Sequence, residues 1–284
     1  MSAVAYVNGA YVPLRAARVS ILDRGFQLGD AIYEVWAVRK GQLYDYDLHL
    51  ARLSRSLAEL RIAAPMSDAA LGLVIREIMR RNRVRDGIVY LQISRGAPSS
   101  RDHVFPPSGT RPTLVLTAKN LDQKAIAARG ETGVKVITAP EARWARRDIK
   151  SVNLLPNVLA RQAAKEAGAF EAWFVDADGF VTEGTSSSAF IVDASGVIRT
   201  RGLSNDLLHG VTRAMLLRLA HERQMRVSET PFTVAEAKAA REAFISAATN
   251  PAIPVVAIDG ASVGGGAPGP IAKALRAAYL GVGA

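Results

Sequence analysis

The chain has 284 residues, 49% of them hydrophobic, so it is long enough to bury a sizeable core in one large or two smaller domains. It contains no cysteine, and its four histidines lack ligand-like spacing, so disulfides and thiolate metal sites are excluded and no metal is expected. The formal charge is +10, but the arginines are scattered and not interleaved with aromatics, so nucleic acid is not expected as a partner.

Hydropathy along the chain gives no sign of a membrane or a secretory segment. No run of about 18 apolar residues occurs, so no membrane partner is expected. The first residues, MSAVAYVNG, lack the basic region and long apolar stretch of a signal peptide. We therefore expect the protein in the cytoplasm.

The first third of the chain alternates strand and helix patterns. Residues 4–12 alternate around Asn8-Gly9, which predicts a β-hairpin, and residues 30–38 predict a further strand. The segment 47–62 is typical of a helix. Four leucines are expected on one side of that helix: Leu48, Leu53, Leu57 and Leu60.

A second helix is predicted over 68–82, followed by two apolar strands at 87–94 and 113–118. The 18 residues between these strands are rich in Gly, Pro, Ser and Arg. Because loops of this length are uncommon in compact domains and usually functional, we expect a functional loop there.

The polar stretch 119–131 is the candidate interdomain linker. It would divide a small N-terminal α/β domain, residues 1–118, from a large C-terminal domain, residues 132–284.

The second half of the chain predicts strands, two hairpins and four helices. Thr233 and Glu236 form a capping-box pattern, which predicts the start of a helix that ends near Ala243. The other predicted elements are a strand at 134–139, a helix at 153–167, hairpins at 172–183 and 189–200, a helix at 211–224, a strand at 244–247 and a last helix after the glycine-rich segment 264–270.

Lys150 stands out among the eight lysines. It lies in RRDIKSVN, between a loop and the apolar start of a helix, whereas most of the others occupy turns or polar helix faces. A lysine amine in such a setting can act as a nucleophile towards a carbonyl. On the pattern alone, an ordinary lysine at a helix start is the favoured interpretation.

Five segments together resemble, in order and spacing, the class IV pyridoxal phosphate aminotransferases, over nearly the whole chain. They are HLARL (49–53), RRDIKSVN (146–153), VTEGTSSS (181–188), HGVTR (209–213) and SAATNPAIPV (246–255). The resemblance implies an α/β fold of the α+β type, with two domains and pyridoxal 5'-phosphate in the interdomain cleft. It also implies a homodimer that acts on amino acids and 2-oxo acids.

The resemblance also implies roles for particular residues. Lys150 resembles the lysine that forms a Schiff base with the cofactor, and Glu183 resembles the carboxylate that pairs with the pyridine nitrogen. Leu208 resembles the residue that packs on the cofactor ring. The phosphate is expected to meet a further set of groups: Arg52, the backbone N–H groups of Val211 and Thr212, and the turn Ala248-Thr249. Relatives often carry a threonine at the position of Ala248.

The loop RGAPSSRDHVFP (95–106) is expected to decide the substrate. Its Arg101 and His103 resemble the carboxylate-binding pair of D-amino-acid aminotransferases, and Tyr33 resembles the tyrosine that completes their pocket. The resemblance therefore implies exchange of an amino group between a D-amino acid, such as D-alanine or D-glutamate, and a 2-oxo acid. The sequence departs from the pattern of typical D-amino-acid aminotransferases at two places. The loop has one extra residue between Gly96 and Arg101, and Ala37 stands where those enzymes carry a lysine.

Other activities of the same family stay open at this point. A branched-chain L-amino-acid aminotransferase would share the cofactor residues but lack the Arg-x-His pair. An (R)-amine transaminase would lack a carboxylate trap, and an aminodeoxychorismate lyase would keep Lys150 and Glu183 but eliminate pyruvate. A basic binding module without a cofactor would show no visible absorbance.

Overall fold

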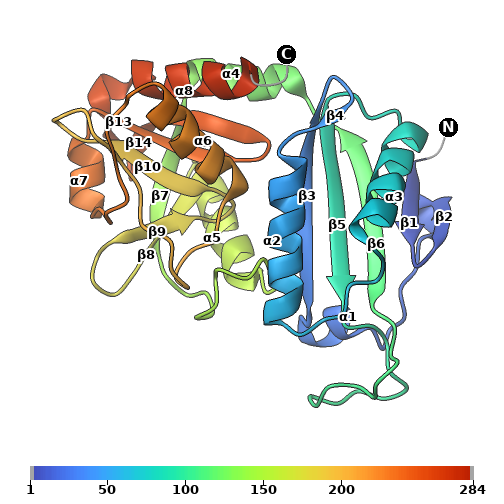
Figure 1. Cartoon of the computed structure of the whole chain (residues 1–284). Helices are drawn as coiled ribbons and strands as arrows, with labels where there is room; N and C mark the ends of the chain where they lie inside the picture. Colours follow the sequence, from blue (N-terminus) through green and yellow to red (C-terminus); the bar gives the residue numbers. More distant parts are fainter. Residues whose placement is uncertain (1–2, 282–284) are drawn as a thin grey trace. The chain divides into compact units, whose positions relative to one another are not determined.

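The computed structural model describes residues 3–281, and the chain divides into two compact units. Unit 1 comprises Met1–Asp122 and Ile149–Asn153, and unit 2 comprises Gln123–Asp148 and Leu154–Ala284. Each unit is built on its own β-sheet with helices packed against it (Figure 1). The mixed α/β architecture is the fold class that the sequence predicts.

Unit 1 contains a six-stranded sheet in which every neighbouring pair is antiparallel. In spatial order its strands are β2 (Ala10–Pro13), β1 (Val4–Val7), β6 (Thr113–Asn120), β5 (Gly87–Ser94), β3 (Ala31–Arg39) and β4 (Gln42–Leu43). Its helices are α1 (Arg24–Leu28), α2 (Tyr46–Glu59) and α3 (Asp68–Arg81), together with the short 3-10 helix η1 (Leu14–Ala16). The predicted hairpin at Asn8-Gly9 is confirmed by the pairing of β1 with β2.

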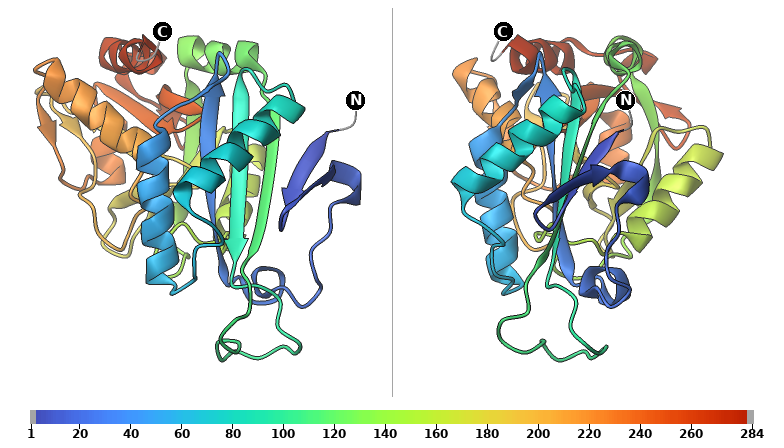
Figure 2. Two further views of the ribbon diagram at one scale, coloured as in Figure 1. Left: turned by 45° about the vertical axis from the view of Figure 1, so that its right-hand side comes forward. Right: turned by 90° about the vertical axis from the view of Figure 1, so that its right-hand side faces the viewer.

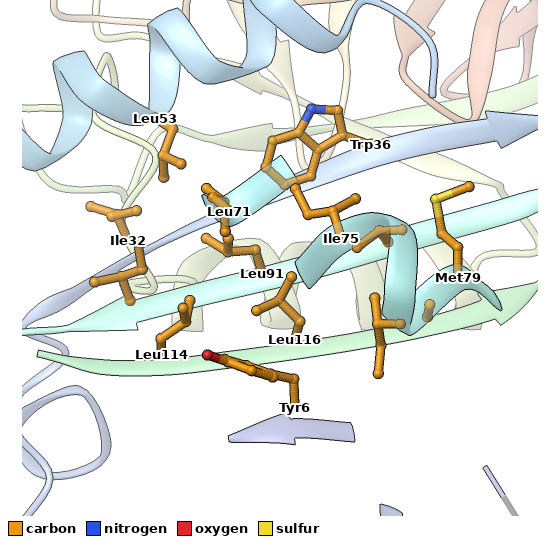
Figure 3. Close-up of a cluster of buried hydrophobic side chains, with 14 of the residues drawn as sticks. Tyr6, Ile32, Trp36, Leu53, Leu71, Ile75, Met79, Leu91, Leu114 and Leu116 are labelled. Carbon is orange, nitrogen blue, oxygen red and sulfur yellow. The ribbon is translucent and has the colours of Figure 1, made fainter. Parts of the chain in front are cut away.

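The core of unit 1 lies between this sheet and helices α2 and α3 (Figure 3). Trp36 from β3, Ile75 from α3 and Leu91 from β5 have no exposed surface. On α2, Leu53 and Leu57 are buried, but Leu48 is 42% exposed, so the expected face was wrong for Leu48. Because 3.6 residues make one turn, a residue five positions before Leu53 lies about 140° away from it around the helix.

Unit 2 contains a nine-stranded mixed sheet. In spatial order its strands are β12 (Val227–Ser228), β11 (Ile198–Arg199), β10 (Ser188–Val192), β13 (Glu242–Ala247), β14 (Asn250–Ile258), β7 (Val134–Pro140), β8 (Glu171–Val175) and β9 (Val181–Gly184), and β15 (Ala261–Ser262) pairs with β14. The pairs β7·β8, β7·β14 and β11·β12 are parallel, and the others are antiparallel. Both predicted hairpins are confirmed, as β8–β9 and β10–β11.

The helices of unit 2 are α4 (Gln123–Thr132), α5 (Leu155–Glu166), α6 (Val211–Glu222), α7 (Val234–Ala239) and α8 (Pro270–Gly281), with the 3-10 helix η2 (Gly264–Gly266) before α8. The capping box of Thr233 and Glu236 is confirmed at the start of α7. This helix ends before the expected Ala243, because the chain must extend again to enter β13 at Glu242. No helix within residues 3–281 is long and apolar enough to cross a membrane.

The unit boundary differs from the expected one in two ways. The stretch 119–131, expected as a linker, carries the end of β6 and most of α4, and the division falls after Asp122. In addition, residues 149–153 belong to unit 1, although the sequence places them in the C-terminal domain.

The reason for this second difference is backbone pairing. Ser151 forms an antiparallel bridge with Ile32 at the start of β3. The N–H of Val152 donates to the carbonyl of Ala31 at 3.1 Å, and Ile149 is buried in the unit 1 core. A strand edge supplies unpaired N–H and C=O groups of this kind, and their burial without partners would be costly.

Candidate active site

Lys150 is held beside Tyr33 on the edge of β3. The N–H of Tyr33 donates to the carbonyl of Lys150 at 2.9 Å, and the Lys150 Nζ lies 4.2 Å from the centre of the Tyr33 ring. The Tyr33 ring also stacks on the Tyr90 ring, with centroids 5.9 Å apart. Among the described residues, no carboxylate forms an ion pair with Lys150. An amine placed on an aromatic face without a counter-ion suits covalent attachment of a carbonyl compound.

Arg52 lies in the interior of unit 1, paired with Glu34. Its Nε and Nη2 donate to the two Glu34 carboxylate oxygens at 2.7 and 2.8 Å, and His49 Nδ1 lies 2.8 Å from the same carboxylate. Burial opposes ionisation of Glu34, but Arg52 and then His49 lower its pKa to about 2. Burial also lowers the pKa of His49. The guanidinium is therefore rigidly oriented, as recognition of an anion requires.

Neither Glu34 nor His49 is singled out by the sequence. Glu34 has no exposed surface, and it lies 18 positions before Arg52. Its signal in the sequence is a carboxylate within an otherwise apolar strand, because a buried charge needs a partner.

Glu183, on β9, is buried and accepts hydrogen bonds from two residues. Arg143 Nη1 donates to its Oε1, and the N–H of Leu208 donates to the same oxygen at 3.1 Å. Burial opposes the charge on Arg143, but its hydrogen bond with Glu141 and its ion pair with Glu183 raise the pKa of Arg143. The structure thus brings Glu183 and Leu208 together and adds Arg143, which the sequence does not single out. A fixed carboxylate of this kind can hold a proton on a ring nitrogen.

The hydroxyl groups that follow Glu183 have a structural partner. Thr185, Ser186 and Ser187 all donate to the carboxylate of Glu171, the last two at 3.0 Å. Glu171 is 1% exposed, so these hydroxyls satisfy a buried charge at the start of β8.

Helix α6 begins with backbone donors that no side chain caps. Its N-cap is Gly210, which makes no side-chain cap hydrogen bond. Val211 and Thr212, in the first turn, are buried. A Cβ at Gly210 would lie 2.8 Å from Ser188 Oγ, so the chain approaches β10 closely there. Free N–H groups at the start of a 12-residue helix suit a phosphate.

The Ala248-Thr249 turn joins β13 to β14. The hydroxyl of Thr249 accepts a hydrogen bond from the Asn250 side chain at 3.0 Å. The turn therefore offers one hydroxyl group, with the alanine beside it contributing only its backbone.

Arg101 and His103 lie on the loop between β5 and β6 and are exposed. The interactions described for these side chains do not connect them with Tyr33 or Lys150. The loop extends past the end of the unit 1 sheet in both views of Figure 2. Ala37 is 3% exposed within β3.

The comparisons with known proteins establish the family. The model of the family described as amino-transferase class IV matches residues 31–258. The chain therefore belongs to the class IV aminotransferases.

The individual relatives that match nearly the whole chain include several D-alanine aminotransferases. A D-alanine aminotransferase of Bacillus licheniformis is 40% identical over 271 residues, covering 95% of this chain and 94% of that protein. Another, from Staphylococcus haemolyticus, is 34% identical over 274 residues, covering 96% of this chain and 95% of that protein.

The solved structures agree on the fold. The branched-chain amino acid aminotransferase of Escherichia coli superimposes with a TM-score of 0.91 at 24% identity, covering 99% of this chain and 95% of that chain. The T.th. branched-chain amino acid aminotransferase, complexed with N-(5'-phosphopyridoxyl)-L-glutamate, gives a TM-score of 0.88 at 28% identity, covering 99% of this chain and 93% of that chain.

Proposed function

We propose that the chain is a pyridoxal 5'-phosphate-dependent transaminase that exchanges the amino group between a D-amino acid, such as D-alanine or D-glutamate, and a 2-oxo acid. Full-length relatives at 34–40% identity that are D-alanine aminotransferases support the substrate class. The observation that carries the chemistry is the setting of Lys150, an amine on the Tyr33 ring in a segment that pairs with β3.

Each unit carries residues of the kind that the family's cofactor requires. Lys150 would hold it covalently, and Glu183, fixed by Arg143 and the Leu208 N–H, would keep its ring nitrogen protonated. When bound, pyridoxal phosphate supplies an electron-accepting ring that stabilises the charge left when the substrate loses its Cα proton. The Lys150 amine, once released, would move that proton between the substrate Cα and the cofactor carbon.

The phosphate would be bound by oriented donors. Arg52 would supply guanidinium N–H donors oriented by Glu34, and Val211 and Thr212 would supply backbone N–H groups at the start of α6. Ala248-Thr249 would complete the set through the turn before β14. Leu208 would pack against the ring while its own N–H stays on Glu183.

Arg101, His103 and Tyr33 would bind the substrate α-carboxylate. An arginine presents two parallel donors to a carboxylate, and a histidine and a phenol can fix its orientation. Holding the carboxylate on one side decides which hand of amino acid directs its Cα hydrogen towards Lys150.

A branched-chain L-amino-acid aminotransferase is the second candidate, favoured by the likeness to the T.th. structure at 28% identity. The deciding experiment mixes the cofactor-loaded protein with D-alanine, D-glutamate, L-alanine and L-leucine separately and follows the visible absorbance of the bound cofactor. We expect this visible absorbance to disappear faster with the D-amino acids than with the L-amino acids. Faster reaction with L-leucine would favour the branched-chain activity instead.

We also propose that the protein is a homodimer. Three large apolar side chains on α5 support this proposal, because patches of this kind mark association surfaces. They are Leu155, Val158 and Leu159, with 69%, 58% and 63% of their surface exposed. Sedimentation should give twice the mass of the chain, and Leu159→Glu should shift the protein towards monomer. Cytoplasmic location stays a prediction.

A further inference from the structure

The loop of residues 95–112 has no helix or strand of its own. Gly96 closes its base: it has a φ of +99°, and a Cβ there would lie 2.1 Å from the carbonyl oxygen of Arg111. Beyond this base, an unsupported loop of such length would sample many conformations. Arg101 and His103 can therefore serve a substrate only if something fixes the loop near them.

The guanidinium of Arg24 meets the loop at that place. Its Nη1 donates to the carbonyl oxygens of Asp102 at 2.6 Å and Val104 at 3.1 Å, and its Nη2 lies 3.3 Å from the carbonyl oxygen of His103. Three consecutive carbonyl groups thus converge on one side chain, which is 5% exposed. Arg24 is itself fixed, because α1 starts with Asp23 accepting from two backbone N–H groups.

Asp30 orients Arg24 from the opposite side. It accepts from Arg24 Nε at 2.7 Å and from Arg95 Nε and Nη2 at 2.7 and 2.9 Å. Burial opposes ionisation of Asp30, but the hydrogen bonds from Arg95 and Arg24 lower its pKa. The carboxylate therefore stays charged, and one cation–anion–cation cluster joins the start of the loop to its middle.

Phe105 supplies a second anchor. The centre of its ring lies 3.7 Å from the Arg95 guanidinium carbon and 4.6 Å from that of Arg61. A cavity of about 420 Å³ is lined in part by His103, whose side chain is not buried. Because packing does not enclose that side chain, its direction depends on the backbone that Arg24 holds.

We propose that Arg24 is a positioning residue for substrate recognition, which fixes the backbone of residues 102–104 and so aims the side chains of Arg101 and His103. This inference rests on the proposed function, in which those two side chains bind the substrate carboxylate. Arg24 would act through the loop backbone, which it binds at three carbonyl groups.

The test compares Arg24→Gln and Arg24→Lys in the cofactor-loaded protein. In single-turnover reactions with D-alanine, Arg24→Gln should raise the concentration needed for half-maximal rate about tenfold or more, with the maximal rate within about threefold of the parent. Arg24→Lys keeps the charge beside Asp30 but cannot span three carbonyl groups, so it should restore only part of the affinity. Arg80→Gln, a change on the exposed side of α3, should behave as the parent protein does.

A second measurement does not depend on activity. Trypsin cleavage after Arg101, which is exposed, reports how often the loop opens far enough to enter a protease. Arg24→Gln should speed the appearance of the fragment ending at Arg101, and Arg80→Gln should not. Phe105→Ala, whose ring is 44% exposed, should act in the same direction and covers the case in which Arg24→Gln does not fold.

The outcomes separate this inference from the proposed function. If the parent protein reacts with D-alanine, and Arg24→Gln and Phe105→Ala bind it equally well and resist trypsin equally, the positioning role is wrong and the function stands. If the parent does not react with D-alanine, the proposed function is wrong. Faster cleavage in both variants with unchanged use of D-alanine would mean that Arg24 holds the loop without serving the substrate, which also overturns the inference.

Discussion

Lys150 and Tyr33 are joined twice, by a backbone hydrogen bond of 2.9 Å and by a 4.2 Å approach of the lysine Nζ to the centre of the tyrosine ring. The backbone bond fixes the position of the lysine along β3, and the ring fixes the direction of its side chain. An amine that must form and release a covalent bond in each cycle benefits from such a defined resting place.

We expect Lys150→Ala to abolish transamination. Without the amine there is no covalent attachment and no group to move the proton at the substrate Cα. Borohydride reduction followed by mass analysis should find the cofactor on Lys150 in the parent protein and on no residue of the variant. Lys165→Ala, an exposed position on α5, is the matched control and should keep full activity. A Lys150→Ala protein with near-normal turnover would refute the assignment.

Glu183→Gln should retain the cofactor but lose about a hundredfold or more in maximal rate, since a neutral amide cannot hold a proton on the ring nitrogen. The control is Glu141→Gln, which removes the other carboxylate bound to Arg143 at 2.6 Å. It should reduce the rate far less. Equal losses in the two variants would show that the arginine cluster matters as a whole and that Glu183 has no separate role.

Arg101→Ala should lower catalytic efficiency with D-alanine by about thirtyfold or more and leave the cofactor bound. Removing one partner of a charge-assisted hydrogen bond in a dry pocket costs about 2 to 5 kcal/mol. The ratio of D-alanine to L-alanine rates should fall as well, because the carboxylate would no longer be held on one side. Efficiency unchanged from the parent would leave the loop without this role.

The buried cluster of Glu34, His49 and Arg52 predicts acid sensitivity. Glu34 has its pKa lowered from 4.5 to about 2, and the pKa of His49 lies below 6.5 in the folded protein. The unfolded chain therefore binds more protons than the folded chain as pH falls. Stability should decrease first below pH 6.5 through His49 and further from 4.5 towards 2 through Glu34.

Urea midpoints measured between neutral pH and about pH 4 test this prediction. Glu34→Gln should be less stable at neutral pH, because the buried Arg52 loses the carboxylate that balances its charge, and should lose less stability on acidification. Glu77 is the control. Its hydrogen bonds with Arg80 and Arg81 also lower its pKa to about 2, but this carboxylate lies on the surface of α3 and not in the core. Glu77→Gln should leave the pH profile nearly unchanged. Identical profiles for both variants would contradict the role of the buried cluster.

Local signals in the sequence predicted most of the helices and strands. The turn at Asn8-Gly9 and the capping box at Thr233 depend only on neighbouring residues, so they are visible without a structure. Lys150 is a candidate because its setting differs from that of the other lysines, and the family resemblance implies its role and that of Glu183.

The partners of these residues could not be predicted in the same way. Arg143 reaches Glu183 over 40 positions of sequence, and Arg24 reaches the loop carbonyls over 78 to 80 positions. The periodicity of apolar residues shows which face of a helix or strand is apolar. It carries no information about which distant charged side chain a residue will bind. Such pairings depend on the topology of the fold, so the sequence alone does not predict them.

The return of residues 149–153 to unit 1 sets an order of events during synthesis. All six strands of the first sheet leave the ribosome within residues 4–120, yet the segment that carries Lys150 follows only after α4 and β7 of the other unit. The same interleaving affects recombination between relatives. A single crossover at the 122/123 boundary would place one parent's Tyr33 against the other parent's Lys150, whereas two additional crossovers around residues 149–153 would keep each lysine with the strand that holds it.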